Sequence, residues 1–299
     1  AEERESAIRL LALMRGESDD IKGMVKWYST LLKEYPRSNF AGEAHHHLGS
    51  SAFQSKDYKT AAIHLSQSRE LNGDRFFEED SMQLMLCAYY QEDTEATLQR
   101  INAYQAKGKG KVPSDVLRWI AAKFFDKKTF KSAEEALELL SKNEDVRAAD
   151  WFFLAQAQVE NGNHRPAVQS IEHFLKETQE PPVRAKGLLI KGRALVAAGD
   201  EEAARKTLDE AIRLQAEGPL NGEARILLAD IDLAKGNPEA AAKTYMTVAV
   251  ILDDENVTPK ALEKAILAYQ RSGKTKEAAD TLNRLRTRYP EYAQQRNLR

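Results

Sequence analysis

Cysteine, proline, glycine and long apolar runs are all scarce in this chain. Its one cysteine, Cys87, excludes internal disulfides and multi-cysteine metal sites, and it leaves the redox compartment undecided. The longest apolar stretches, such as Met82–Tyr90 and Leu188–Ala198, are interrupted by polar residues and fall short of the roughly 20 residues that span a bilayer. The 299 residues include only 9 Pro and 15 Gly, the residues that most often interrupt helices, so long helical stretches are possible. We therefore expect a soluble chain without a membrane span.

An excess of charge of either sign is also missing. The formal net charge is −2, so the whole chain offers no bulk attraction to nucleic acid or to an anionic membrane. Two stretches, Lys107–Lys131 and Lys260–Arg299, are locally basic. Such runs most often keep a helix face soluble, and helix C-termini favour cations in any case. We expect no nucleic-acid partner.

Sequence motifs of catalysis are absent as well. The chain has no phosphate-binding glycine loop, no Gly-x-Ser-x-Gly elbow, no His-Glu-x-x-His and no paired cysteines. Cys87 has no basic neighbour in sequence that would lower the pKa of its thiol, which favours a packed side chain over a nucleophile. We therefore expect no enzymatic activity and no cofactor.

A run of three histidines, His45 to His47, invites a metal interpretation. Adjacent residues on a helix point about 100° apart, so the three cannot converge on one ion. One of them could instead meet His64 across a helical hairpin. We interpret these histidines as structural or solvated and expect no metal site.

What the chain does contain is a composition for helices and a turn that recurs. Ala, Leu, Glu, Lys and Arg are abundant and 30% of the residues are charged, which favours an all-α chain. In the second half of the chain a glycine-containing pair is followed, four residues after its second member, by alanine. The pairs are Gly162-Asn163, Gly199-Asp200, Gly236-Asn237 and Gly273-Lys274, and the alanines are Ala167, Ala204, Ala241 and Ala278. Glycine suits the left-handed residue that ends a helix, so each pair predicts a corner between two helices.

The corners are evenly spaced. Successive glycines lie 37 residues apart, which accommodates two helices and two short loops. The same frame continues backwards through Lys128-Thr129, Asp93-Thr94, Lys56-Asp57 and Asp19-Asp20. We predict a single array over residues 1–299, with repeats that begin near Glu5, Gly42, Glu79, Ser114, Ala148, Ala185, Gly222 and Pro259.

Apolar residues within each repeat follow helical rather than strand spacing. In the fifth repeat Trp151, Leu154 and Ala155 share one face of the first helix. A small residue recurs in the first helices at Ala12, Gly49, Ala121, Ala155, Gly192 and Ala229. Small residues let two backbones approach closely, so each repeat is expected to pack as a tight hairpin that stacks on its neighbours.

This pattern resembles the tetratricopeptide repeat family. The resemblance rests on large-x-x-Leu-Gly/Ala in the first helix, Gly-Asp/Asn at the turn, alanine in the second helix and a final proline, as in Tyr35-Pro36 and Tyr289-Pro290. It implies an all-α fold, an α-solenoid of about eight helix-turn-helix repeats in a right-handed superhelix. Three repeats depart from the pattern: the first has Met24 in place of Ala, the third has Leu98 there, with Ala96 two residues out of register, and the sixth has Lys191 at a core position.

A narrower resemblance involves about one repeat. The segment from Tyr35 to Ala44, followed by Leu48-Gly49 and by Asp57 to Ala62, is similar to bacterial envelope proteins that include the Tol-Pal coordinator and outer-membrane assembly lipoproteins. The resemblance implies a periplasmic or envelope location, with a cytoplasmic location as the alternative. The chain begins at Ala1 without methionine or a leader, which fits either a removed targeting segment or a piece of a longer protein.

The family resemblance also implies a binding face. First helices of such arrays line the concave surface, so their outward positions are candidates for contact with a peptide or helix of a partner protein. By helical phase these are His46, Ser50, Gln83, Cys87, Arg118, Ala122, Phe152, Gln156, Leu189, Arg193, Ile226, Asp230, Glu263 and Leu267. We expect a protein-binding scaffold. The alternative is a structural or self-associating module with an empty groove.

Overall fold

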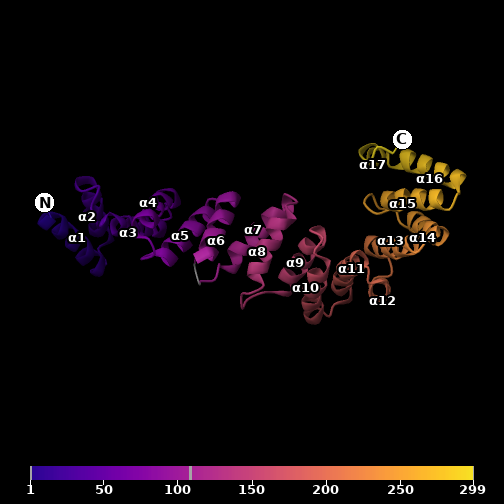
Figure 1. Cartoon of the computed structure of the whole chain (residues 1–299), viewed down its shortest axis with the longest axis horizontal. Helices are drawn as coiled ribbons and strands as arrows, with labels where there is room; N and C mark the ends of the chain where they lie inside the picture. The colour runs from indigo at the N-terminus through magenta and orange to yellow at the C-terminus, as the bar shows by residue number, and fades with distance from the viewer. Residues whose placement is uncertain (1, 108–109, 299) are drawn as a thin grey trace. The chain divides into compact units, whose positions relative to one another are not determined.

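The chain is built from α-helices joined by short connections (Figure 1). The computed structural model describes residues 2–107 and 110–298. Helix accounts for 79% of the structure, and the described residues contain no strand. This confirms the all-α, solenoid fold class. In the described part of the chain no helix is both long and apolar enough to cross a bilayer.

Seventeen helices are formed by the described residues. They are α1 Glu2–Glu17, α2 Ile21–Glu34, α3 Ala41–Gln54, α4 Tyr58–Asn72, α5 Phe77–Tyr90, α6 Thr94–Lys107, α7 Ser114–Asp126, α8 Phe130–Leu140, α9 Ala148–Glu160, α10 His164–Glu177, α11 Pro181–Ala198, α12 Glu201–Leu214, α13 Pro219–Ala234, α14 Pro238–Ile251, α15 Thr258–Arg271, α16 Thr275–Arg288 and α17 Pro290–Gln295.

The helices group into two compact units, residues 1–127 (unit 1) and 128–299 (unit 2). In unit 1 the packed hairpins are α1/α2, α3/α4 and α5/α6, followed by α7. In unit 2 they are α9/α10, α11/α12, α13/α14 and α15/α16, with α8 before them and the short α17 after. Each hairpin also packs against the next one, so neither unit has a single central core.

Each predicted repeat start lies within a helix, and these helices alternate along the chain. Ser114 and Ala148 are the first residues of α7 and α9, and the other six starts lie one to four residues inside α1, α3, α5, α11, α13 and α15. The spacing of the turns therefore located the repeats, although it did not locate the helix ends.

The hairpin turns share one backbone conformation. Gly162, Gly199, Gly236 and Gly273 have φ between 75° and 80°, the left-handed region that glycine adopts without steric cost. The earlier turns place side-chain-bearing residues in the same region, and these are Asp19, Lys56, Glu92 and Lys128, with φ of 58°, 64°, 55° and 56°. The turn geometry is therefore common to the whole set even where glycine is missing.

The third turn corrects the predicted register by one residue. Its left-handed residue is Glu92, whereas Asp93-Thr94 was predicted. Asp93 is instead the N-terminal cap of α6, because its carboxylate accepts a hydrogen bond from the Ala96 backbone N–H at 2.9 Å. The small-residue position of α6 is consequently Thr97, which is fully buried, and neither Ala96 nor Leu98. Glutamate gives no turn signal of its own, which explains the error.

Small residues hold the two helices of each hairpin together. Ala167, Ala204 and Ala241 are completely buried on second helices. On the first helices, a Cβ added at Gly49 would lie 2.7 Å from Leu65 Cγ, and one added at Gly192 would lie 2.4 Å from Leu208 Cδ2. Both distances are shorter than packing tolerates, so these glycines allow the close approach of the paired backbones.

Two departures from the repeat pattern have a structural reason. Met24 replaces the expected alanine in α2 and is buried, and it is accommodated because Gly16 faces it, with a Cβ position only 3.1 Å from the Met24 sulfur. Lys191 at a core position of α11 is only partly exposed, and its ammonium group donates to Glu172 of α10 at 2.7 Å. The aliphatic stem can thus stay near the core while the charge is paired.

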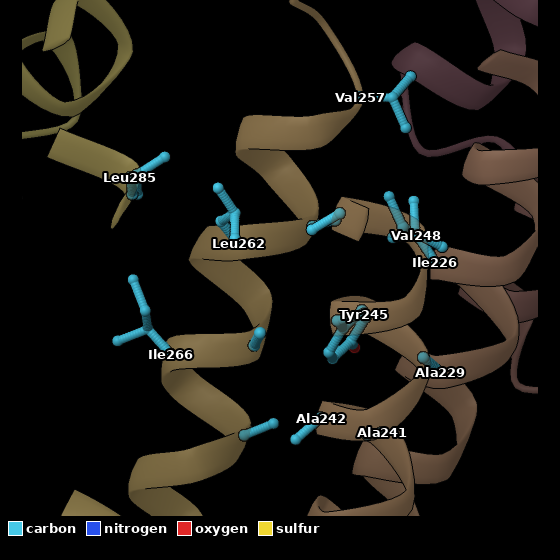
Figure 2. Close-up of a cluster of buried hydrophobic side chains, with 14 of the residues drawn as sticks. Ile226, Ala229, Ala241, Ala242, Tyr245, Val248, Val257, Leu262, Ile266 and Leu285 are labelled. Carbon is cyan, nitrogen blue, oxygen red and sulfur yellow. The ribbon is translucent and has the colours of Figure 1, made fainter. Parts of the chain in front are cut away.

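One large apolar cluster lies in the last two hairpins, α13 to α16 (Figure 2). Figure 2 shows Leu262 and Ile266 pointing from α15 toward the side where Leu285 of α16 lies. Tyr245 and Val248 of α14 lie on the opposite side of α15. Helix α15 therefore buries both of its flanks, as a stacked repeat requires.

Candidate functional site

First and second helices of unit 2 differ in how closely they approach one another. Helix α11 contacts both α9 and α13, the first helices of the flanking hairpins. The second helices α10 and α12 are instead separated by a cleft of about 690 Å³, which Val168 and Lys176 line from one side and Ala203 and Lys206 from the other. In this unit α9, α11 and α13 are therefore packed more closely together than α10 and α12. In unit 1 the first helices α3 and α5 also contact each other.

Four of the predicted contact residues lie inside the fold. His46, Cys87, Leu189 and Ile226 are at most 8% exposed, so the expectation that they face outward is wrong. His46 stacks on Phe76 with ring centroids 3.9 Å apart. Leu189 and Ile226 belong to the apolar clusters of unit 2, and Cys87 to one in unit 1. Helical phase gives the direction of a side chain, but the next hairpin covers part of that direction.

Other predicted residues link successive first helices. The Ser50 hydroxyl donates to Gln83 Oε1 at 3.0 Å, which joins α3 to α5. Asp230 of α13 accepts a hydrogen bond from the Lys264 ammonium group of α15 at 2.8 Å. Arg193 of α11 contacts Glu160 of α9 at 3.2 Å. These partners are 33 or 34 residues apart, close to one repeat, and that spacing is the sequence signal which could have revealed them.

The last predicted acidic residue, Glu263 on α15, is paired in the same way with the C-terminal segment. It accepts a hydrogen bond from the Tyr292 hydroxyl at 2.6 Å and contacts Arg296 at 3.2 Å. Burial, and then the hydrogen bond to Glu263, raise the pKa of Tyr292 to about 12. Together with the three pairs above, these contacts form what we call the inter-repeat ladder.

Five of the predicted residues are neither buried nor part of this ladder. Leu267 is 42% exposed on α15, Ala122 is exposed on α7, and Gln156 is half-buried on α9. Phe152 is also half-buried, with its ring centroid 5.2 Å from that of Phe174. Arg118 is mostly covered and reaches Asp115 at 3.5 Å. On the first helices of unit 2 the accessible predicted residues thus combine apolar, aromatic and amide groups.

The comparisons with known proteins agree with the hairpin geometry. Residues 154–219 and 189–257 match one tetratricopeptide repeat model, and residues 260–292 match a second. These residues form tetratricopeptide repeats. Tetratricopeptide repeats generally mediate protein–protein interactions and are typically non-enzymatic. No curated protein sequence is significantly similar to the chain.

Solved structures with the same architecture are distant in sequence. The Naa15/Naa10 complex bound to HypK-THB has a chain that is 17% identical, with a TM-score of 0.52 over 98% of this chain and 42% of that one. A Podospora anserina putative kinesin light chain with nearly identical tetratricopeptide-like repeats is 24% identical over 58% of this chain and 94% of that chain, with a TM-score of 0.47 or 0.48 in its two structures. MamA is 20% identical over 60% of this chain and 94% of that one, with a TM-score of 0.46. Such similarity is informative about the fold alone.

The histidines of the second tetratricopeptide-like hairpin each have a partner in the fold. Nδ1 of His45 lies 2.9 Å from Nδ1 of His64 across the hairpin, the one contact predicted for this run. His47 stacks on Tyr28. Burial lowers the pKa of His45, His47 and His64, because it disfavours the charged imidazolium. The described residues contain no group of three or more His, Cys, Asp or Glu able to hold a metal ion.

The buried thiol is similarly inert. Cys87 is completely buried in α5, and burial raises the pKa of its thiol to about 11 although Arg100 opposes the effect. At that pKa almost no thiolate forms near neutral pH, which argues against Cys87 as a nucleophile.

A charged cluster between the first three hairpins was not foreseen from the sequence. Glu43 of α3 is 2% exposed, and its carboxylate meets Arg9 at 2.8 Å and Arg75 at 3.0 Å. Burial alone would raise the pKa of Glu43, but Arg9 and then Arg75 outweigh it and hold the pKa below its ordinary value. Arg9 and Glu43 are 34 residues apart, so this pair has the repeat spacing of the ladder.

The basic C-terminal stretch is partly neutralised by carboxylates of the preceding repeats. Arg296 contacts Glu263, and Arg288 contacts Asp253 at 2.8 Å. Arg284 donates to the carbonyl oxygen of Ala249. These three arginines thus serve packing between hairpins.

Proposed function

We propose that the chain is a non-enzymatic scaffold that binds a peptide or helix of a partner protein along the inner face of its first helices. Its tetratricopeptide repeats support a protein partner. The observation that carries the proposal is the close contact of α9, α11 and α13 beside the separated second helices α10 and α12, which is the packing expected where the first helices form a concave face. Concave faces with mixed apolar and polar side chains suit extended peptides and amphipathic helices.

The inter-repeat ladder supports this role indirectly. It joins α3 to α5, α9 to α11 and α13 to α15 through hydrogen bonds of 2.8–3.2 Å between side chains. A face that is fixed before binding loses less conformational entropy when a partner docks. We assign the ladder residues Ser50, Gln83, Arg193, Asp230 and Glu263 to positioning, and Phe152, Gln156 and Leu267 to contact.

A paired substitution experiment tests the proposed face. Gln156→Arg combined with Leu267→Asp adds bulk and charge to the first helices, and should abolish capture of a crosslinked partner from the native cell. The matched control, Gln169→Arg with Val250→Asp, makes the same changes at exposed positions of the second helices α10 and α14. Equal loss of capture in both proteins, or loss only in the control, would contradict the proposal.

We further propose that the two units form one array over residues 1–299 and that the protein works in a bacterial envelope complex. The second statement depends on the resemblance of the segment from Tyr35 to Ala62 to envelope proteins. Fractionation of the native cells tests it, since a partner captured only from cytoplasmic fractions would contradict an envelope role.

Self-association is a second candidate function, and the first hairpin favours it. Leu10 and Met14 on α1 are 55% and 62% exposed, which is unusual for large apolar side chains on one helix. Sedimentation of the chain beside a Leu10→Glu/Met14→Glu variant separates the alternatives. A dimer that the substitutions dissociate would favour self-association, and a monomer in both cases would exclude it.

A further inference from the structure

Five aromatic side chains of unit 1 form an unbroken chain of ring contacts, which we call the aromatic strip. Its members are Phe53, Tyr58, Tyr89, Tyr90 and Trp119. Tyr58 stacks on Tyr90 with centroids 4.8 Å apart, and Phe53 contacts both. Tyr89 contacts Tyr90 at 5.1 Å and Trp119 at 5.2 Å. The strip thus crosses three successive first helices, α3, α5 and α7, and includes the first residue of α4.

None of the five rings is buried, and Tyr90 is 51% exposed. Aromatic side chains that serve only a core are mostly covered, and tyrosine hydroxyls inside a fold usually find a hydrogen-bond partner. Within the described residues, the hydroxyls of Tyr58, Tyr89 and Tyr90 accept and donate no hydrogen bond. The strip therefore offers ring faces together with free hydroxyl donors.

Three lysines without an ion pair to a described residue lie around the strip. The Lys123 ammonium group lies 5.7 Å from the Trp119 ring, and Lys56 and Lys59 are exposed beside Tyr58. None of the three lysines forms an ion pair with a described residue. The nearby carboxylates of Asp57 and Asp93 are held at the N-termini of α4 and α6, where each accepts a backbone N–H group, and Glu92 is a further acidic residue at this edge.

We propose that the aromatic strip binds a proline-rich, acidic segment of the partner protein in an extended polyproline II conformation. This inference rests on the proposed scaffold function and names the chemistry of one partner segment. Proline rings pack on aromatic faces, and the polyproline II helix loses little entropy on binding because it is already extended. Its backbone carbonyls are free to accept hydrogen bonds from the tyrosine hydroxyls, and acidic flanks complement Lys56, Lys59 and Lys123.

A single-stranded nucleic acid also stacks on aromatic rings, but the arrangement favours proline. Tyr58 and Tyr90 already stack on each other at 4.8 Å with an interplanar angle of 20°, so no base can enter between them. Proline needs only the outer edges and faces of such rings. The net charge of −2 also works against a polyanion.

Fluorescence anisotropy on the chain of residues 1–299 tests the inference with three labelled probes. They are a glutamate-flanked decaproline peptide, a Gly-Ser peptide of the same length and charge, and oligouridylate. Decaproline should bind at least about tenfold more tightly than the Gly-Ser peptide, a difference of about 1.4 kcal/mol. Equal binding of the two peptides, absence of decaproline binding, or tighter binding of oligouridylate would each overturn it.

Variants locate the binding on the strip. Tyr58→Ala and Tyr90→Ala should each weaken decaproline binding by about tenfold, whereas Phe153→Ala, a control at an exposed ring of α9, should not change it. Tyr90→Phe keeps the ring contacts and should lose only the hydroxyl contribution, so it remains informative if an alanine variant unfolds. Unchanged affinity in all tyrosine variants would overturn the assignment. If partner capture still depends on Gln156 and Leu267 in that case, the scaffold proposal stands without the strip.

Discussion

At the scale of single residues, the fold depends on small side chains where paired helices cross. The buried alanines of the second helices recur with the turn and could be predicted from the sequence. The equivalent position in α6, Thr97, could not be predicted, because the left-handed residue of the preceding turn is Glu92, and glutamate is not a residue type that signals such a turn. The position of a residue around its helix also did not predict how deeply it is buried. Leu189 and Ile226 were predicted to face outward, but the neighbouring hairpins cover them.

Enlarging one of these small residues should disrupt its hairpin. Ala204→Leu adds a branched side chain where the native residue is fully buried, so we expect it to lower the free energy of unfolding by about 1 to 3 kcal/mol. Ala167→Leu should behave alike. Ala198→Leu, beside the turn and exposed, should cost much less. Urea denaturation measures the free energy of unfolding of all three variants. Equal losses would mean that the alanines at the helix crossings have been assigned to the wrong positions.

The half-buried histidines His45, His47 and His64 predict a dependence of stability on pH. Their pKa values are lowered in the folded chain, so between the folded pKa and the unfolded value of about 6.5 the unfolded chain binds more protons. Stability should therefore be fully present above about pH 6.5 and fall as the pH decreases through that value. His64→Gln should reduce the change in the free energy of unfolding per pH unit, while His173→Gln on α10 should leave that change as it is. A slope of opposite sign in urea denaturation would contradict the assignment.

At the scale of elements, the left-handed turn is what the hairpins have in common. The four glycine turns of unit 2 could be predicted from sequence because few other residues adopt this conformation. The turns of unit 1 were found only by extending the repeat period backwards. In those turns Asp19, Lys56 and Glu92 have a Cβ that crowds the backbone, a cost of about 1 to 2 kcal/mol each.

Exchanging residues at these turns should change stability in opposite directions. Lys56→Gly relieves the crowding but adds freedom to the unfolded chain, so a net gain of about 0.5 to 1 kcal/mol is expected. Gly199→Ala introduces the crowding and should cost about 1 kcal/mol. An added Cβ at Gly199 would meet no other atom within 4 Å, so any loss reports on the backbone alone. Thermal unfolding by circular dichroism gives both values, and a stabilised Gly199→Ala would refute this explanation of the turns.

At the scale of the whole molecule, repeat spacing predicted the architecture better than the binding face. Eight repeat starts lie in eight first helices because turn and helix lengths fix the period. The face was harder to predict, since four of its predicted residues are buried and others bond to the neighbouring repeat. Pairs such as Asp230 and Lys264 depend on how one hairpin stacks on the next, which no single repeat encodes.

The central claim is that partners bind the inner face formed by the first helices. A photoreactive amino acid placed at Gln156 on α9, and in a second protein at Gln169 on α10, tests it in the native cell. The account predicts a crosslinked partner, identified by mass spectrometry, from position 156 and none from position 169. A partner crosslinked from position 169 alone would contradict it.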